Sequence, residues 1–157
     1  MDNYLFNQLE FIRNNTLSAV ENSTDEMANN IPEGFRNNIR WHLGHIYYTL
    51  ECFAFDPINL PMILPNDFKI FFANGTSPLN WNSTTPSLEE IISLLREQPV
   101  RIRSELNYRL LDKVDKPFIH PTGRITLETV GGFLSFNLYH EGMHLNSIKN
   151  YKSLYNK

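Results

Sequence analysis

The amino-acid sequence predicts an all-α protein, a four-helix bundle with one long crossover between its second and third helices. Four segments place apolar residues at the three- and four-residue spacing of an amphipathic helix. No segment sustains the apolar–polar alternation that is typical of a half-buried strand. The chain has 157 residues, enough for one sizeable hydrophobic core and too few for two. We therefore expect a single domain over residues 1–157.

The first predicted helix covers residues 3–22 and has a helical apolar stripe. The polar run Ser23-Thr24-Asp25 interrupts this pattern, and Pro32 and Gly34 indicate a loop. The stripe consists of Leu5, Phe6, Leu9, Ile12, Thr16, Leu17 and Val20.

The second predicted helix begins at Asn37 or Asn38, either of which can cap it. It ends before Asp56-Pro57, because a residue that precedes proline disfavours the helical conformation. The crossover that follows, residues 57–85, is rich in proline and aromatic residues and is long for a connection, so we expect a short helix at residues 67–73. The helical stripe consists of Ile39, His42, Leu43, His45, Ile46, Thr49, Leu50 and Phe53.

The third predicted helix covers residues 85–110, and two starts are open. Thr85 can cap a helix that has Pro86 at its first position. Alternatively, Ser87 and Glu90 can form a capping box.

Pro99 predicts a kink in this third helix, since proline removes a backbone donor and clashes with the preceding turn. Residues 117–125 predict a loop with room for a short extended piece. The fourth predicted helix covers residues 126–149. Its stripe consists of Val130, Phe133, Phe136, His140, His144 and Ile148.

Charge and composition exclude several classes of function. The net charge is −3 and no stripe of Lys and Arg is present, so we expect no nucleic-acid partner. No run of apolar residues is long enough for a membrane span, and the first six residues lack the pattern of a signal peptide. The single cysteine, Cys52, cannot form an internal disulfide, which suits a reducing compartment. We therefore expect a cytoplasmic protein.

His140 and His144 are the strongest chemical signal in the sequence. Four residues apart on a helix, their imidazoles lie on one face and can bind one metal ion. The segment also reads H-E-x-x-H, the zinc-protease helix in which the glutamate, here Glu141, is the general base. No His, Asp, Glu or Cys follows His144, so a third protein ligand must come from upstream.

The second helix offers two candidates for that ligand, His45 and His42, which are three residues apart and share a face. We favour His45, because the neighbouring Gly44 allows a close approach of helices. Three histidines leave open coordination positions for water or substrate, as a catalytic metal requires. Imidazole suits zinc, nickel, copper or iron. His120 lies beside a proline in a loop and is expected at the surface or at the rim of a site.

Other candidates have a structural alternative. Glu141 is either a general base or a solvated or salt-bridged carboxylate, and Cys52 shares the face of His45 but is expected to be a buried, inert thiol. Several aromatic residues are expected to pack in the core: Trp41, Tyr47, Tyr48, Phe136 and Tyr139.

Two segments together resemble the DinB-like, or YfiT-like, superfamily of small four-helix metalloproteins. Residues 41–46 read W-H-L-G-H-I and residues 138–144 read L-Y-H-E-G-M-H. The resemblance extends over nearly the whole chain and implies an up-down-down-up bundle, a homodimer, and a divalent ion held by His45, His140 and His144. One departure is that His144-Leu145-Asn146-Ser147-Ile148 replaces the common H-x-G-Q-I.

The resemblance implies a thiol-dependent S-transferase or a hydrolase that acts on a small electrophilic molecule. Zinc or nickel is the expected ion, and a low-molecular-weight thiol is the expected cosubstrate. The crossover's Phe and Trp residues would wall the pocket. The alternative is a non-catalytic, stress-associated bundle with a structural ion or none. A protease is disfavoured, because most enzymes with H-E-x-x-H take their third ligand from downstream.

Overall fold

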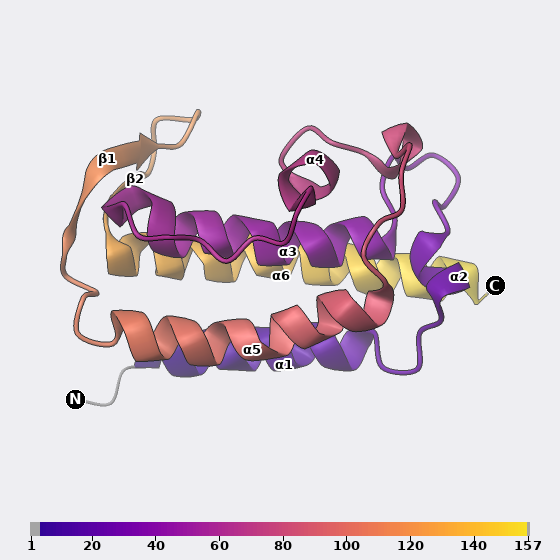
Figure 1. Cartoon of the computed structure of the whole chain (residues 1–157), viewed down its shortest axis with the longest axis horizontal. Coiled ribbons are helices and arrows are strands. Elements are labelled where there is room, and N and C mark those ends of the chain that lie inside the picture. The colour runs from indigo at the N-terminus through magenta and orange to yellow at the C-terminus, as the bar shows by residue number, and fades with distance from the viewer. Residues whose placement is uncertain (1–3, 157) are drawn as a thin grey trace.

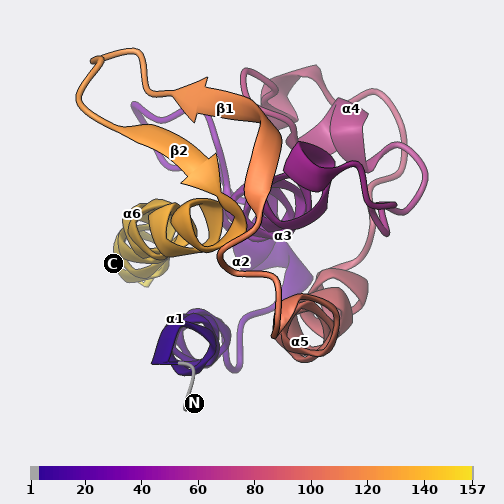
Figure 2. The ribbon, with the colours of Figure 1, turned by 90° about the vertical axis from the view of Figure 1, so that its left-hand side faces the viewer.

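The computed structural model describes residues 4–156 and is mostly helical (Figure 1). Four long helices lie side by side: α1 (Tyr4–Ala19), α3 (Ile39–Phe55), α5 (Leu88–Leu106) and α6 (Val130–Tyr155). Viewed end-on in Figure 2, they occupy the corners of a square, with α3 and α1 each packed against both α5 and α6. Within the described residues, no helix has both the length and the apolar character that crossing a membrane requires.

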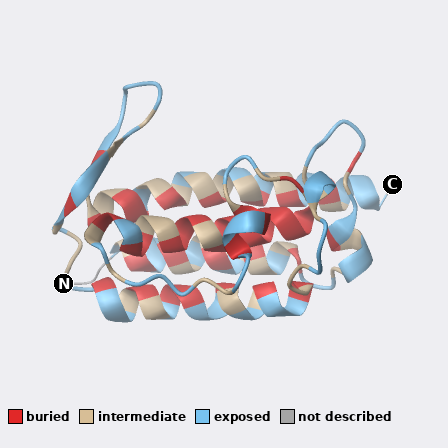
Figure 3. Cartoon of the chain, turned by 45° about the horizontal axis from the view of Figure 1, so that its top comes forward, coloured by how far each residue is buried: buried red, intermediate tan, exposed pale blue. Residues whose placement is uncertain are grey.

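Helix α3 is buried along nearly its whole length (Figure 3). The bundle covers one side of it, and α4 (Phe68–Phe72), the short helix predicted in the crossover, covers the other. Phe68, Phe71 and Phe72 of α4 are themselves buried in this contact. Two 3₁₀ turns complete the crossover, η1 (Asp56–Ile58) and η2 (Pro78–Asn80).

The helix starts follow the capping chemistry of the sequence. Asn38, one of the two predicted caps, accepts a hydrogen bond from the Trp41 amide at 2.8 Å and begins α3. At α5 the second alternative is confirmed, because Ser87 and Glu90 form a reciprocal capping box. Side chains that accept backbone N–H groups stabilise a helix start by about 1 kcal/mol.

Two elements correct the sequence-based expectations. A short helix, α2 (Asp25–Asn29), begins with Thr24 as its cap, where the sequence indicated a break and a loop. An antiparallel hairpin of β1 (Lys113–Ile119) and β2 (Thr126–Thr129) replaces the predicted loop and the first residues of the fourth helix. The all-α class is therefore wrong in this one respect. The strands escaped detection because an irregular register between Lys113 and Phe118 disrupts the inside–outside alternation.

Pro99 lies inside α5, and the helix continues through it. Because proline has no amide hydrogen, the carbonyl of Leu95, four residues earlier, has no helical donor. The Arg13 guanidinium of α1 supplies one instead, with Nη1 donating to the Leu95 oxygen at 2.7 Å and to Gln98 Oε1 at 3.1 Å. The proline thus leaves a carbonyl of α5 free to accept a hydrogen bond from α1.

Candidate metal centre

Helices α3 and α6 bring together the three histidines that the sequence singled out. One ligand-capable atom from each of His45, His140 and His144 lies within 4.8 Å of the others. His140 Nε2 is 3.2 Å from His45 Nε2 and 3.2 Å from His144 Nε2. Nitrogen atoms around a tetrahedral zinc ion lie about 3.3 Å apart when each bond is about 2.0–2.1 Å long. The two distances from His140 therefore match the spacing of nitrogen atoms around a single ion.

The ring of His45 is fixed from two sides. Its Nδ1 lies 2.7 Å from the Phe72 carbonyl oxygen, which can only accept a hydrogen bond, so Nδ1 carries the proton. In the neutral ring, Nε2 then has a free lone pair, and this is the atom that faces His140. Trp41 stacks on the ring with centroids 4.5 Å apart and planes 11° apart. Such outer contacts select the tautomer and the orientation of a metal ligand.

Gly44 makes this arrangement sterically possible. A Cβ atom at this position would lie 2.4 Å from Cδ1 of the Phe72 ring. The close approach that the sequence predicted is therefore made by α4 of the crossover. The same contact brings the Phe72 carbonyl to His45. Gly44 consequently acts on the site through the position of α4.

Replacing Gly44 by alanine is expected to displace Phe72 and to destabilise the protein by about 1–3 kcal/mol, the usual cost of overpacking. Urea unfolding followed by circular dichroism measures the loss. Gly142→Ala is the matched control, because a Cβ at Gly142 meets no atom within 4 Å. Equal stability of the two variants would contradict the steric role of Gly44.

His42, the alternative third ligand, lies behind His144 and outside the three-histidine group. Its Nδ1 is 2.7 Å from Nδ1 of His144. When Nε2 of His144 faces an ion, Nδ1 of His144 carries the proton. This N–H group then donates a hydrogen bond to Nδ1 of His42. His42 thus contacts one member of the three-histidine group without belonging to it. The geometric group contains His45, and metal binding by His45 stays a prediction.

Replacing His42 by phenylalanine is expected to weaken zinc binding about 10–100-fold, because His144 loses the acceptor that holds its ring. Calorimetric titration of the metal-free protein with zinc measures the change. His42→Gln, whose amide oxygen can accept the same hydrogen bond, should recover part of the affinity. Wild-type affinity in His42→Phe would show that the contact is irrelevant to metal binding.

Burial keeps all four imidazoles neutral. It lowers the pKa of His42 and of His140 to about 4, with the neighbouring His45 adding to the effect. Burial is also the largest cause that lowers the pKa of His144 to about 2. The charges of the other three histidines lower that pKa further. For His45, burial lowers the pKa against the opposing hydrogen bond to Phe72. Neutral imidazole is the form that binds a metal ion.

These shifts predict that the metal-free protein loses stability in acid. The unfolded chain takes up protons on its histidines near pH 6.5, whereas the folded state resists protonation down to about pH 4. Stability is therefore complete above pH 6.5 and falls as the pH drops toward 4, by about 3 kcal/mol for each of His42 and His140. Urea unfolding at pH 7 and pH 4 tests this. His140→Leu should show the smaller pH dependence, and an identical dependence would refute the assignment.

Glu141 faces α1, with no exposed surface. Its carboxylate accepts hydrogen bonds from Arg13 Nε at 2.9 Å and Nη2 at 3.2 Å, and from Thr16 Oγ1 at 3.0 Å. The structure thus gives the salt-bridged alternative. Glu141 follows His140 by one residue and is rotated about 100° from it around the helix. We therefore propose no general-base role for Glu141.

A cavity of about 500 Å³, which we call the inner cavity, opens on His45 and His140. Aromatic and apolar side chains dominate its lining, as is usual in small-molecule sites. Its other lining residues are Tyr48, Thr49, Cys52, Phe53, Asn74, Phe118, His120, Pro121, Phe136, Tyr139 and Met143.

This lining corrects two expectations. Tyr48, Phe136 and Tyr139 were expected in the core but border the cavity. The crossover's Phe and Trp residues were expected to form its wall, but Asn74 is the crossover residue that lines it. The phenylalanines of α4 instead pack into the core. Helical spacing did place Phe136 four residues before His140 on the predicted stripe, but spacing alone does not separate core from cavity.

Cys52 is half-buried and lines the inner cavity, where burial raises the pKa of its thiol. The thiol therefore stays protonated at neutral pH and is a poor nucleophile. Its predicted inertness agrees with this environment.

The altered end of the motif, residues 145–148, follows His144 on α6. Asn146 is exposed, and the Ser147 hydroxyl donates to the Met143 carbonyl at 3.3 Å. Neither side chain forms a hydrogen bond with the four histidines in the described part of the chain. The contact to His144 comes from His42 instead.

Comparisons with known proteins agree with this architecture. The family model of the DinB superfamily matches residues 8–148, a range that contains all four clustered histidines. A search of curated proteins finds no match.

Proposed function

Because the chain belongs to the DinB superfamily, we propose that it is a divalent-metal-dependent enzyme that acts on small molecules. The observation that carries this proposal is the convergence of three neutral imidazoles beside a cavity. The up-down-down-up order of helices belongs to the same proposal. It is supported by the packing of α3 against α6, the two helices that carry the histidines.

His45, His140 and His144 would hold the ion, and zinc or nickel suits a set of three imidazoles. A divalent ion with open positions lowers the pKa of a bound thiol or water and thereby supplies a nucleophile at neutral pH. The chain's own residues orient this site. Phe72 fixes His45, His42 fixes His144, and the apolar lining of the inner cavity limits access of water.

We further propose an S-transferase or hydrolase reaction, with a low-molecular-weight thiol or water as the nucleophile and a small electrophile as its partner. Two features support an external nucleophile. The Cys52 thiol in the cavity is protonated, and the Glu141 carboxylate forms a buried ion pair with Arg13. A thiol or water at the ion needs neither group for its activation.

Metal analysis together with two assays tests the proposal. The protein should bind about one zinc or nickel ion per chain and should conjugate glutathione to 1-chloro-2,4-dinitrobenzene or hydrolyse p-nitrophenyl acetate. Chelation should abolish the activity, and zinc or nickel should restore it. Failure to bind zinc, nickel or manganese would exclude the enzyme. Bound metal without either activity would favour the alternative, a non-catalytic bundle with a structural ion.

A further inference from the structure

We propose that a second cavity, beneath the turn of the β1–β2 hairpin, binds the carboxylate-bearing tail of the substrate or cosubstrate. We call it the outer cavity. The inference rests on the proposed function only in placing the reactive end of that molecule at the three histidines.

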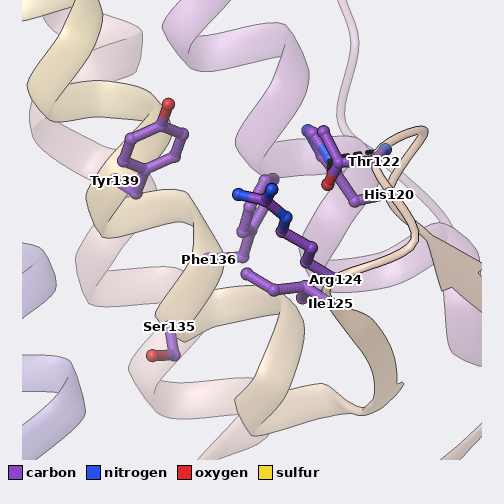
Figure 4. Close-up of a pocket in the computed structure, with 7 residues that line it drawn as sticks. All are labelled: His120, Thr122, Arg124, Ile125, Ser135, Phe136 and Tyr139. Atoms are coloured by element: carbon purple, nitrogen blue, oxygen red, sulfur yellow. Dashed lines mark hydrogen bonds between the residues drawn. The ribbon is translucent and has the colours of Figure 1, made fainter.

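The outer cavity has a volume of about 490 Å³ and adjoins the inner cavity. The hairpin and α6 form it together (Figure 4). Three residues, His120, Phe136 and Tyr139, line both cavities. A ligand can therefore extend from the histidines to the hairpin turn. The outer cavity is lined by His120, Thr122, Arg124, Ile125, Ser135, Phe136 and Tyr139.

Arg124 is the charged group of this lining. Its side chain extends from the hairpin toward α6 in Figure 4. No carboxylate of the described residues lies within salt-bridge distance of it. The guanidinium fork is therefore free to bind a planar carboxylate through two parallel hydrogen bonds.

His120 adds a second donor. His120 Nδ1 lies 2.9 Å from the Thr122 hydroxyl and accepts from the Thr122 backbone N–H at 3.3 Å, an arrangement that favours the tautomer with its proton on Nε2. Since Nδ1 is occupied within the turn, Nε2–H is the group that His120 can offer to a ligand. In that tautomer the turn supplies an N–H donor from His120, which lines both cavities.

The remaining lining matches an anionic tail with an apolar stem. Ser135 and Tyr139 contribute hydroxyl groups, whereas Ile125 and Phe136 contribute apolar surface. The lining contains no acidic residue. Two adjoining cavities of about 490 and 500 Å³ suit a molecule of peptide size better than a single small electrophile.

Ligand titrations followed by NMR test the outer cavity separately from the metal. S-Methylglutathione carries two carboxylates and no free thiol, and its diethyl ester has the same skeleton without those charges. We expect S-methylglutathione to shift the backbone amides of His120 and of residues 122–125 in the metal-free protein and to bind at least about fivefold more tightly than the ester. Arg124→Gln should remove this preference. Arg36→Gln is the control, because Arg36 is also exposed and the substitution changes the net charge equally.

Equal affinity for the acid and the ester, or an unchanged preference in Arg124→Gln, would overturn the proposal. Tighter Arg124-dependent binding of glycerol 3-phosphate than of S-methylglutathione would overturn the assignment to a carboxylate. The proposed function fails by a different measurement. The protein would then bind no zinc, nickel or manganese, whatever the result at Arg124.

Discussion

Arg13→Met is expected to lower the free energy of unfolding by about 3–5 kcal/mol, because it leaves a carboxylate buried without its partner. Arg13 and Glu141 have exposed fractions of 1% and 0%, so water cannot replace the lost guanidinium. The substitution also removes the donor to the Leu95 carbonyl, the oxygen that Pro99 leaves unpaired. Arg13 of α1 is the residue that binds both Glu141 of α6 and the Leu95 carbonyl of α5, so the substitution removes the hydrogen bonds that link these three helices.

Urea unfolding of Arg13→Met measures this loss, and two further variants identify its origin. Arg13→Met/Glu141→Leu removes both charges and should recover a large part of the stability. Arg103→Met breaks an ion pair with Glu10 whose side chains are 40% and 42% exposed, so it should cost less than about 1 kcal/mol. Losses of the same size in Arg13→Met and Arg103→Met would contradict the buried network.

His45→Ala is expected to weaken zinc or nickel binding by more than about 100-fold, with loss of any metal-dependent activity. Two histidines remain four residues apart on α6, and such a pair alone holds an ion weakly. Calorimetric titration measures the affinity, and circular dichroism checks that the helices persist. His120→Ala is the matched control, since His120 lies outside the three-histidine group. Wild-type affinity in His45→Ala would mean that the ion, if bound, lies elsewhere.

The sequence predicted the long helices because each combines a regular apolar stripe with a local cap. Asn38 and Ser87 bond to amides three residues away, so their effect is readable from a few adjacent letters. The three-histidine group was predictable for a similar reason. His140 and His144 lie on one helix, and Gly44 together with the resemblance to a known family favoured His45 over His42.

What the sequence could not predict depends on contacts between distant residues. The partner of Glu141 is Arg13, 128 residues away, and no local pattern links the two. The hairpin was missed because its irregular register hides the alternation of a strand. Without the hairpin, neither cavity could be foreseen, since His120 reaches the site only through that fold. The homodimer and the cytoplasmic location stay predictions.

The position of Glu141 next to His140 has a consequence for the whole of α6. One residue is bound to α1 and its neighbour faces α3, so the buried ion pair fixes the rotation of α6 about its own axis. The angle at which His140 and His144 present their nitrogen atoms depends on that rotation. Pro99 leaves the Leu95 carbonyl free to accept a hydrogen bond from Arg13. This contact with α5 helps to fix the same rotation of α6, because Arg13 also binds Glu141. We therefore expect the affinity of the three histidines for a metal ion to depend on Arg13 of α1 and Pro99 of α5, although neither belongs to the three-histidine group.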